Sequence, residues 1–257
     1  MEMGPVDNVG PGDAFISYML DGFDSIEGWP GQKESVAFMV VFRQLFERRS
    51  EQGGACEIGV HHGKYLIALH NILRPAHSLG IDVFEDQVKN IDVSGRGSAQ
   101  ITAQNIDAFA HNPASIALLA KDSLDIGPQD IANFIDLYGR FAIFSVDGGH
   151  TPLHTAYDFF TASQLTSPNG VIAIDDLFHP GWPGVTEGLF SALAAKRSPF
   201  VPFFITRKKA FLCHLSVFGE YRSFVEEAYG ERYNREVEFV EFCGWRIPSL
   251  SFGPEYD

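Results

Sequence analysis

The sequence predicts an α/β protein in which a parallel sheet is covered by helices on both faces and ends in a C-terminal antiparallel β-hairpin. From residue 54 onward, short apolar runs alternate with amphipathic segments of helical length. A glycine-containing turn joins the first apolar run to its helix, and acidic residues follow several of the later runs. Strands that alternate with helices of this length require right-handed crossovers between parallel strands. The expected sheet is therefore Rossmann-like.

The expected elements follow in a regular order. A helix over residues 33–49 is followed by strands at 55–59, 77–83, 115–120, 140–146 and 170–174, with helices at 64–73, 101–111, 128–138, 152–165 and 185–195 between or after them. Residues 200–206 and 210–215 flank Arg207, Lys208 and Lys209, which predicts a hairpin with a solvated cationic turn. A helix over 221–229 and a polar tail complete the chain.

Three regions are expected. Residues 1–50 form an N-terminal arm or helical lid, since residues 1–31 are rich in Gly, Pro and Asp with aromatic residues between them. Residues 51–216 form the α/β domain, and residues 217–257 form a C-terminal helix and tail. The arm is suited either to close over a bound molecule or to make a contact between two copies of the chain.

Composition excludes several functions. The 257 residues include 19 basic and 33 acidic ones, a net charge of −14, which disfavours binding to nucleic acid or to a membrane surface. Cys56, Cys213 and Cys243 are too few and too scattered for a disulfide framework or a zinc site. Neither a secretory leader nor an apolar stretch of membrane-spanning length is visible. These features predict a cytoplasmic protein.

A glycine turn marks the first candidate binding element. The segment over residues 57–63, which contains Glu57, Gly59, Val60, His61 and Gly63, joins the first strand to its helix. Glycine lets the backbone turn tightly and approach a ligand closely. A dinucleotide fingerprint needs Gly-x-Gly-x-x-Gly, and Glu57 stands where its first glycine would fall. The acid favours a cationic or hydroxyl-rich ligand over a pyrophosphate, although such a turn also occurs for structural reasons alone.

Polar residues follow the next two strands. Asp82 ends the second strand, where a carboxylate can accept hydrogen bonds from both ribose hydroxyls. Asp122 and Ser123 follow the third strand, at a position suited to the edge of an adenine. Each acid alone would be read as a helix cap or a solvated turn. At the ends of three successive strands, together with the glycine turn, they predict a nucleoside site.

Three carboxylates follow the fourth and fifth strands. If these strands are neighbours, Asp147, Asp175 and Asp176 meet at one edge of the sheet. Crowded carboxylates favour a neutralising cation, and oxygen ligands suit Mg²⁺ or another divalent ion. The alternative is that these acids cap turns. However, Thr151 and Pro152 already supply the start of the following helix, which leaves Asp147 available.

His150 is the candidate general base. It lies three residues after Asp147, in the turn that opens a helix, and an imidazole can titrate near neutral pH. The chain contains nine histidines, so a surface or core histidine at this position is the alternative.

Together these residues resemble class I S-adenosylmethionine-dependent methyltransferases. Within that class, over residues 50–215, they look like the divalent-metal-dependent O-methyltransferases of sugar and antibiotic biosynthesis, including the macrocin-type and cephalosporin-hydroxylase-like groups. The motifs concerned are Glu57-x-Gly59-x-x-x-Gly63, Asp82, Asp122-Ser123, Asp147-Gly148-Gly149-His150 and Asp175-Asp176.

The resemblance implies a role for each residue. Glu57, Gly59 and Gly63 would shape the methionine end of the S-adenosyl-L-methionine pocket, and Asp82 would hold the ribose. Phe84 would lie against the adenine, and Asp122 and Ser123 would meet its edge. Asp147, Asp175 and Asp176 would bind Mg²⁺, with His150 as the base.

The expected activity is O-methylation of a small-molecule hydroxyl, on a sugar or a secondary metabolite, with a homo-oligomer through the arm as a possibility. Three alternatives stay open. They are a methyltransferase that needs no metal, a nucleotide-dependent oxidoreductase, and a non-catalytic nucleoside-binding module.

Overall fold

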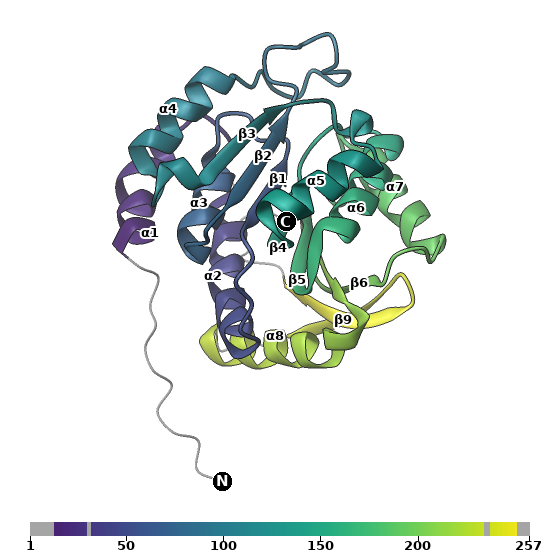
Figure 1. Ribbon diagram of the computed structural model, residues 1–257. Helices are drawn as coiled ribbons and strands as arrows, with labels where there is room; N and C mark the ends of the chain where they lie inside the picture. The colour runs from purple at the N-terminus through teal and green to yellow at the C-terminus, as the bar shows by residue number, and fades with distance from the viewer. Residues whose placement is uncertain (1–12, 30–31, 234–236, 251–257) are drawn as a thin grey trace.

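The computed structural model describes residues 13–29, 32–233 and 237–250. Within them the chain forms one nine-stranded sheet in the order β3-β2-β1-β4-β5-β7-β6-β9-β8 (Figure 1). Its first five strands are parallel to one another, as the sequence predicts: β1 (Ala55–Ile58), β2 (Ser78–Asp82), β3 (Ile116–Ala120), β4 (Phe141–Val146) and β5 (Thr166–Ile174). Both faces of these strands are covered, and β1 and β4 are buried along their whole length.

The predicted C-terminal hairpin is present. β6 (Phe200–Thr206) and β7 (Ala210–His214) pair in antiparallel fashion, and β7 lies between β5 and β6. The expectation of a polar tail is wrong for residues 238–250. There, β8 (Glu238–Phe242) and β9 (Trp245–Leu250) form a second hairpin, and β9 pairs with β6. The cause is local: Cys243 and Gly244 both have positive φ, which suits a tight two-residue hairpin turn.

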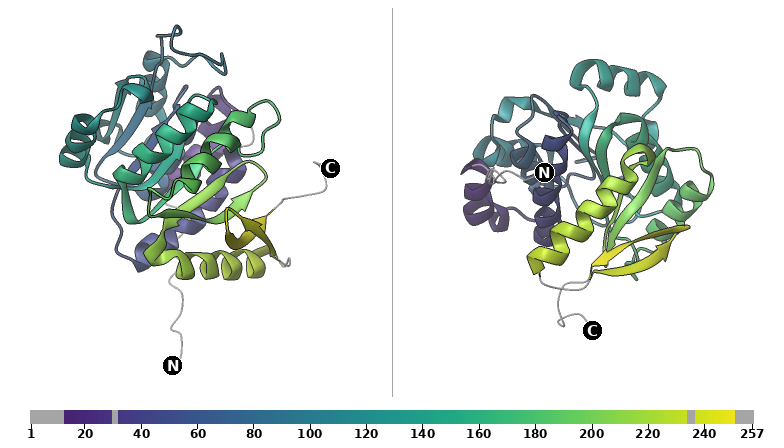
Figure 2. Two further views of the ribbon diagram at one scale, coloured as in Figure 1. Left: turned by 90° about the vertical axis from the view of Figure 1, so that its right-hand side faces the viewer. Right: turned by 90° about the horizontal axis from the view of Figure 1, so that it is seen from below.

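Helices cover the two faces in two groups (Figure 2). The apolar side chains of the first group share one core cluster, with α1 (Asp13–Ser17), α2 (Gln32–Arg48), α3 (Lys64–Leu73), α4 (Ala99–Phe109) and α8 (Phe218–Tyr233). The other face is covered by α5 (Pro128–Tyr138), α6 (Pro152–Leu165) and α7 (Pro183–Ala194). Short helical turns at Tyr18–Gly22, Phe23–Ser25, Pro113–Ser115, Ser123–Asp125 and Leu215–Val217 complete the described elements.

Helix starts follow the local sequence. α6 begins at Pro152, after Thr151, whose side chain accepts a hydrogen bond from the His154 backbone N–H at 3.2 Å. α3 and α5 begin and end where the sequence predicts them. None of the described helices combines the length and the apolar character needed to cross a bilayer.

The register of the parallel strands brings their carboxyl ends to one level. Ile58 of β1 pairs with Ile81 of β2 and with Val146 of β4, and Val146 in turn pairs with Ile174 of β5. The residues that follow these four positions therefore emerge side by side. The strand order reverses between β1 and β4, and ligands of open α/β sheets bind in the crevice beyond such a reversal.

Candidate active site

A cavity of about 730 Å³ lies at the carboxyl ends of the parallel strands. This volume is within the range of small-molecule and cofactor sites. Most of the predicted site residues line it: Glu57, Gly59, Val60, His61, Asp82, Asp122, Ser123, Asp147, His150, Asp175 and Asp176. The structure thus brings together residues from five strand ends that are far apart in the sequence.

The glycine turn is closely packed. Gly59 has a φ of +85°, and a Cβ at this position would lie 1.8 Å from the Asp147 carbonyl oxygen. Gly63 has a φ of +86° and precedes α3. A side chain of α4 holds the backbone of the turn, because Thr102 Oγ1 donates a hydrogen bond to the His61 carbonyl at 2.8 Å. Only glycine at position 59 allows β1 and β4 to approach this closely.

Asp82 organises the turn. Its Oδ2 accepts a hydrogen bond from the His61 backbone N–H at 2.8 Å, and its Oδ1 accepts one from the Phe84 N–H at 2.7 Å. Each carboxylate oxygen retains a second lone pair, so Asp82 can still accept from a ligand hydroxyl. The structure does not bring the Phe84 ring to the cavity. That ring is fully buried in the core cluster and is not among the lining residues.

Asp122 and Ser123 reach the cavity after β3. The Asp122 side chain also caps the short turn that follows, accepting from the Leu124 N–H at 3.0 Å. Ser123 is buried and contacts Asp158 of α6, a carboxyl group that the sequence analysis missed. Burial raises the pKa of Asp158 to about 7, although the neighbouring Ser123 side chain acts in the opposite direction.

Glu57 presents a buried acid to the cavity. It is 1% exposed, and its Oε2 atom has no hydrogen-bond partner among the described residues. Burial raises its pKa to about 8, although the positive charge of Lys209 acts in the opposite direction. A buried carboxyl with an open acceptor fits a ligand that donates hydrogen bonds, such as the amino group of a methionine moiety.

Three carboxylates, Asp147, Asp175 and Asp176, form an acidic rim of the cavity, and Asp175 is set apart from the other two by its partner. Ligand atoms of Asp147, His150 and Asp176 all lie within 4.8 Å of one another. Burial, reinforced by the charge of Asp175, raises the pKa of Asp147 well above its usual range. Two carboxylates at this rim supply the oxygen ligands that a divalent cation such as Mg²⁺ accepts, so the donor set fits that ion.

Asp175 has a different partner. Lys209 Nζ lies 2.6 Å from Asp175 Oδ2, and the Lys209 side chain is buried. The expectation that Lys209 belongs to a solvated turn is therefore wrong, whereas Arg207 and Lys208 are exposed. Burial alone would lower the pKa of Lys209, but the interactions with Asp175, Tyr65 and Asp147 together outweigh it and raise that pKa. Lys209 thus neutralises the negative charge of Asp175, which the sequence pattern grouped with the metal ligands Asp147 and Asp176.

His150 lies between two carboxylates. Its Nδ1 is 2.8 Å from Asp92 Oδ2 and its Nε2 is 3.1 Å from Asp176 Oδ2, while its ring stacks on Trp182 at 4.5 Å. Burial opposes the charged imidazole, but the hydrogen bonds with Asp176 and Asp92 outweigh burial and raise the pKa of His150 to about 9. Asp92 comes from the long loop between β2 and α4, and no spacing in the sequence points to it.

The fold has a cavity where the strand order reverses between β1 and β4. This arrangement defines an α/β protein with a small-ligand site at the carboxyl ends of its strands. Residues 56–177 match the family model described as a methyltransferase domain. This region runs from β1 to the residues after β5 and includes the ends of all five parallel strands. Residues 56–177 therefore form a methyltransferase domain, the kind of domain that the sequence motifs resemble.

Solved structures share the fold. The O-methyltransferase NovP is 14% identical, with a TM-score of 0.57 over 70% of this chain and 79% of that one. Cofactor-bound Rv0187 from MTB is 14% identical, with a TM-score of 0.51 over 83% and 99%. An O-methyltransferase from Bacillus cereus, in complex with SAH, is 17% identical, with a TM-score of 0.50 over 80% and 92%. No curated protein sequence compared with the chain matches it significantly.

Proposed function

We propose that the protein transfers the methyl group of S-adenosylmethionine to a hydroxyl group of a small molecule, on a sugar or a secondary metabolite. The observation that carries this proposal is the position of His150, Asp147 and Asp176 at the rim of the cavity that Glu57 and Asp82 also line. Groups for proton transfer and groups suited to a cofactor thus share one site. The similarity in fold to O-methyltransferases supports the same reaction.

Each part of the cavity has a task in binding the cofactor. Asp82 accepts hydrogen bonds from the ribose, while Glu57 accepts one from the methionine amino group. Asp122 and Ser123 meet the adenine edge. When bound, S-adenosylmethionine supplies a methyl group on a positively charged sulfur. Holding it against a fixed acceptor turns a bimolecular displacement into a reaction within one complex.

The reaction itself requires one proton to leave the acceptor. The hydroxyl oxygen forms the new bond to the methyl carbon as the carbon–sulfur bond breaks, and the sulfur keeps the electron pair. His150 takes the hydroxyl proton at Nε2, while Asp92 holds the ring through Nδ1. This role requires that Nε2 has first lost the proton that it shares with Asp176.

Asp147 and Asp176 would hold a divalent cation, with Asp175 behind them in its pair with Lys209. When bound there, Mg²⁺ supplies positive charge that stabilises the acceptor oxygen as its proton leaves. Chelation should therefore abolish turnover, and Mg²⁺ or Mn²⁺ should restore it. Full activity in excess chelator would favour the metal-independent alternative.

The test is incubation of the protein with S-adenosylmethionine, Mg²⁺ and a panel of sugar, catechol and polyketide acceptors, with mass measurement of the products. A product heavier by one methylene group supports the proposal. Titration calorimetry with S-adenosylmethionine and NAD separates methyl transfer from the oxidoreductase alternative. Cofactor binding without methyl transfer to any acceptor would instead favour a non-catalytic module.

A further inference from the structure

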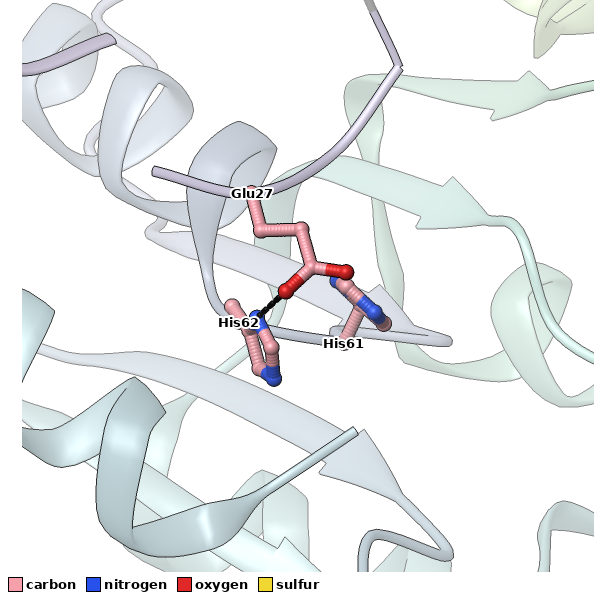
Figure 3. A group of neighbouring side chains, drawn as sticks. All are labelled: Glu27, His61 and His62. Atoms are coloured by element: carbon pink, nitrogen blue, oxygen red, sulfur yellow. Dashed lines mark ion pairs between the residues drawn. The ribbon is translucent and has the colours of Figure 1, made fainter. Parts of the chain in front are cut away.

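A second group of possible metal ligands lies on the other side of the glycine turn. Glu27, His61 and His62 each offer one atom, and these atoms lie within 4.8 Å of one another (Figure 3). The two histidines follow β1, whereas Glu27 belongs to the segment before α2. All three residues line the cavity. None of them belongs to the acidic rim of Asp147 and Asp176.

The backbone holds the two imidazoles side by side. Side chains of consecutive residues usually point in different directions, yet the rings of His61 and His62 lie 4.0 Å apart with an interplanar angle of 33°. His61 has a φ of +52°, in the left-handed region that residues with a Cβ seldom adopt. Hydrogen bonds fix the turn: Asp82 accepts from the His61 N–H, and Asn105 Nδ2 donates to the His62 carbonyl at 2.9 Å.

One imidazole nitrogen of the group has no partner: His61 Nδ1 is buried and makes no hydrogen bond in the described part of the chain. Glu27 Oε2 lies 3.5 Å from His62 Nδ1, which is longer than an ordinary hydrogen bond. Two ligands of one tetrahedral zinc ion, each about 2.0–2.1 Å from the metal, are themselves about 3.3 Å apart. The separation therefore fits two ligands of a common ion better than a direct hydrogen bond.

The side chains of the group differ in how far they are exposed to solvent. The Glu27 side chain is 76% exposed and can rotate, whereas the His62 side chain is only 7% exposed. Ile26, next to Glu27, is buried and anchors the backbone of this segment. Trp29 packs its ring against His61 at 5.4 Å. Two preformed imidazoles and one adjustable carboxylate leave at least one coordination position open.

We propose that Glu27, His61 and His62 form a binding site for a first-row transition ion of the zinc type, separate from the oxygen-rich site at Asp147 and Asp176. Two imidazole nitrogens and one carboxylate oxygen favour Zn²⁺, Co²⁺ or Ni²⁺ over Mg²⁺. The bound ion joins the segment before α2 to the turn after β1, at the edge of the cavity. This proposal does not depend on methyl transfer.

The test uses the full chain without a histidine tag, freed of metal by chelation and then saturated with Mg²⁺ to fill the oxygen-rich site. Titration with Co²⁺ should produce a saturable ligand-field absorption that Zn²⁺ displaces. Because Trp29 contacts His61, Co²⁺ should also quench tryptophan fluorescence, and the Trp29→Phe variant should lose that part of the quenching.

Variants locate the site. Glu27→Gln and His62→Ala should each weaken Co²⁺ binding by at least about 10-fold, since even the loss of a supporting partner costs this much in a metal site. His77→Ala, an exposed histidine outside the cavity, is the matched control and should bind like wild type. Glu27→Gln changes an exposed side chain, so its effect is separate from failure to fold.

Three results would overturn the proposal. The first is the absence of any saturable Co²⁺ absorption. The second is equal Co²⁺ affinity in wild type and Glu27→Gln. The third is binding that Asp176→Asn removes and Glu27→Gln leaves intact, because the ion would then occupy the acidic rim.

Discussion

Lys209 Nζ lies 2.6 Å from Asp175 Oδ2 at the end of β5, and the two side chains are 2% and 13% exposed. The ammonium group also lies 4.7 Å from the centre of the Tyr65 ring. A charge buried to this degree is stable only with its partner. The pair therefore connects the β6–β7 turn to the acidic edge of the cavity.

Lys209→Met should lower the free energy of unfolding by about 3–5 kcal/mol, because it leaves Asp175 buried and uncompensated beside Asp147. Denaturant titration followed by circular dichroism measures this loss. Lys208→Met changes the exposed neighbour and should alter stability by no more than about 0.5 kcal/mol. The double variant Lys209→Met with Asp175→Asn should recover part of the loss. Equal effects of Lys209→Met and Lys208→Met would contradict this account.

Asp82→Ala should weaken S-adenosylhomocysteine binding by about 1–3 kcal/mol, through the loss of the ribose hydrogen bonds. Titration calorimetry provides the measurement. Asp86→Ala is the control, because Asp86 is an exposed acid in the same loop and does not line the cavity. Identical affinities of the two variants would remove Asp82 from the binding site.

Asp158 should make stability depend on pH. Burial raises its folded pKa to about 7, whereas an unfolded aspartate titrates near 3.8. Because the folded value is the higher one, the stabilising effect of the protonated form is complete below the unfolded pKa. It is lost as the pH rises through about 7.

The Asp158→Asn variant removes this titration. Its free energy of unfolding relative to wild type should therefore rise by about 1.4 kcal/mol for each pH unit between the two pKa values and level off above them. Urea titrations from pH 5 to pH 8 test this slope. Asp136→Asn, which changes an exposed acid on α5, should show no such trend. A difference between Asp158→Asn and wild type that stays constant with pH would refute the assignment.

The sequence predicts the parallel part of the fold well because its signals are local. Apolar runs of strand length and helix starts such as Thr151-Pro152 act within a few residues, and β1 to β5 lie within a few residues of their predicted positions. The second hairpin was missed because Glu238, Glu241 and Arg246 interrupt its apolar residues and Pro248 argues against a strand. Its signal was the turn at Cys243 and Gly244, which places Phe242 and Ile247 in the core.

Strand ends were also predictable as a group, since parallel strands in register deliver their following residues to one edge. The side-chain pairs that join distant parts of the chain at the cavity could not be predicted. Lys209 lies 34 residues after Asp175, and Asp92 lies 58 residues before His150, so only the folded chain brings each pair together. No periodicity or spacing in the sequence carries that information. The same holds for Glu27, which meets His62 from a different segment.

The final prediction concerns the ring of His150. His150→Ala should lower the turnover number by about 10²–10⁴-fold, the usual contribution of a general base, while leaving S-adenosylhomocysteine affinity nearly unchanged. Asp92→Asn keeps the imidazole but weakens its orientation, since Asp92 Oδ2 contacts both Nδ1 and the backbone N–H of His150. A loss of about 10- to 100-fold is expected for this positioning residue.

The pH profile separates these roles from a structural one. The wild-type rate should rise with pH, because a base must be unprotonated to accept the hydroxyl proton. Removing the Asp92 charge should move the midpoint of this rise to lower pH, since that carboxylate favours the protonated imidazole. The rise should be absent in His150→Ala. If His150→Ala turns over within a few-fold of wild type with the same profile, His150 is not the base, and the acceptor must lose its proton to another group at the rim.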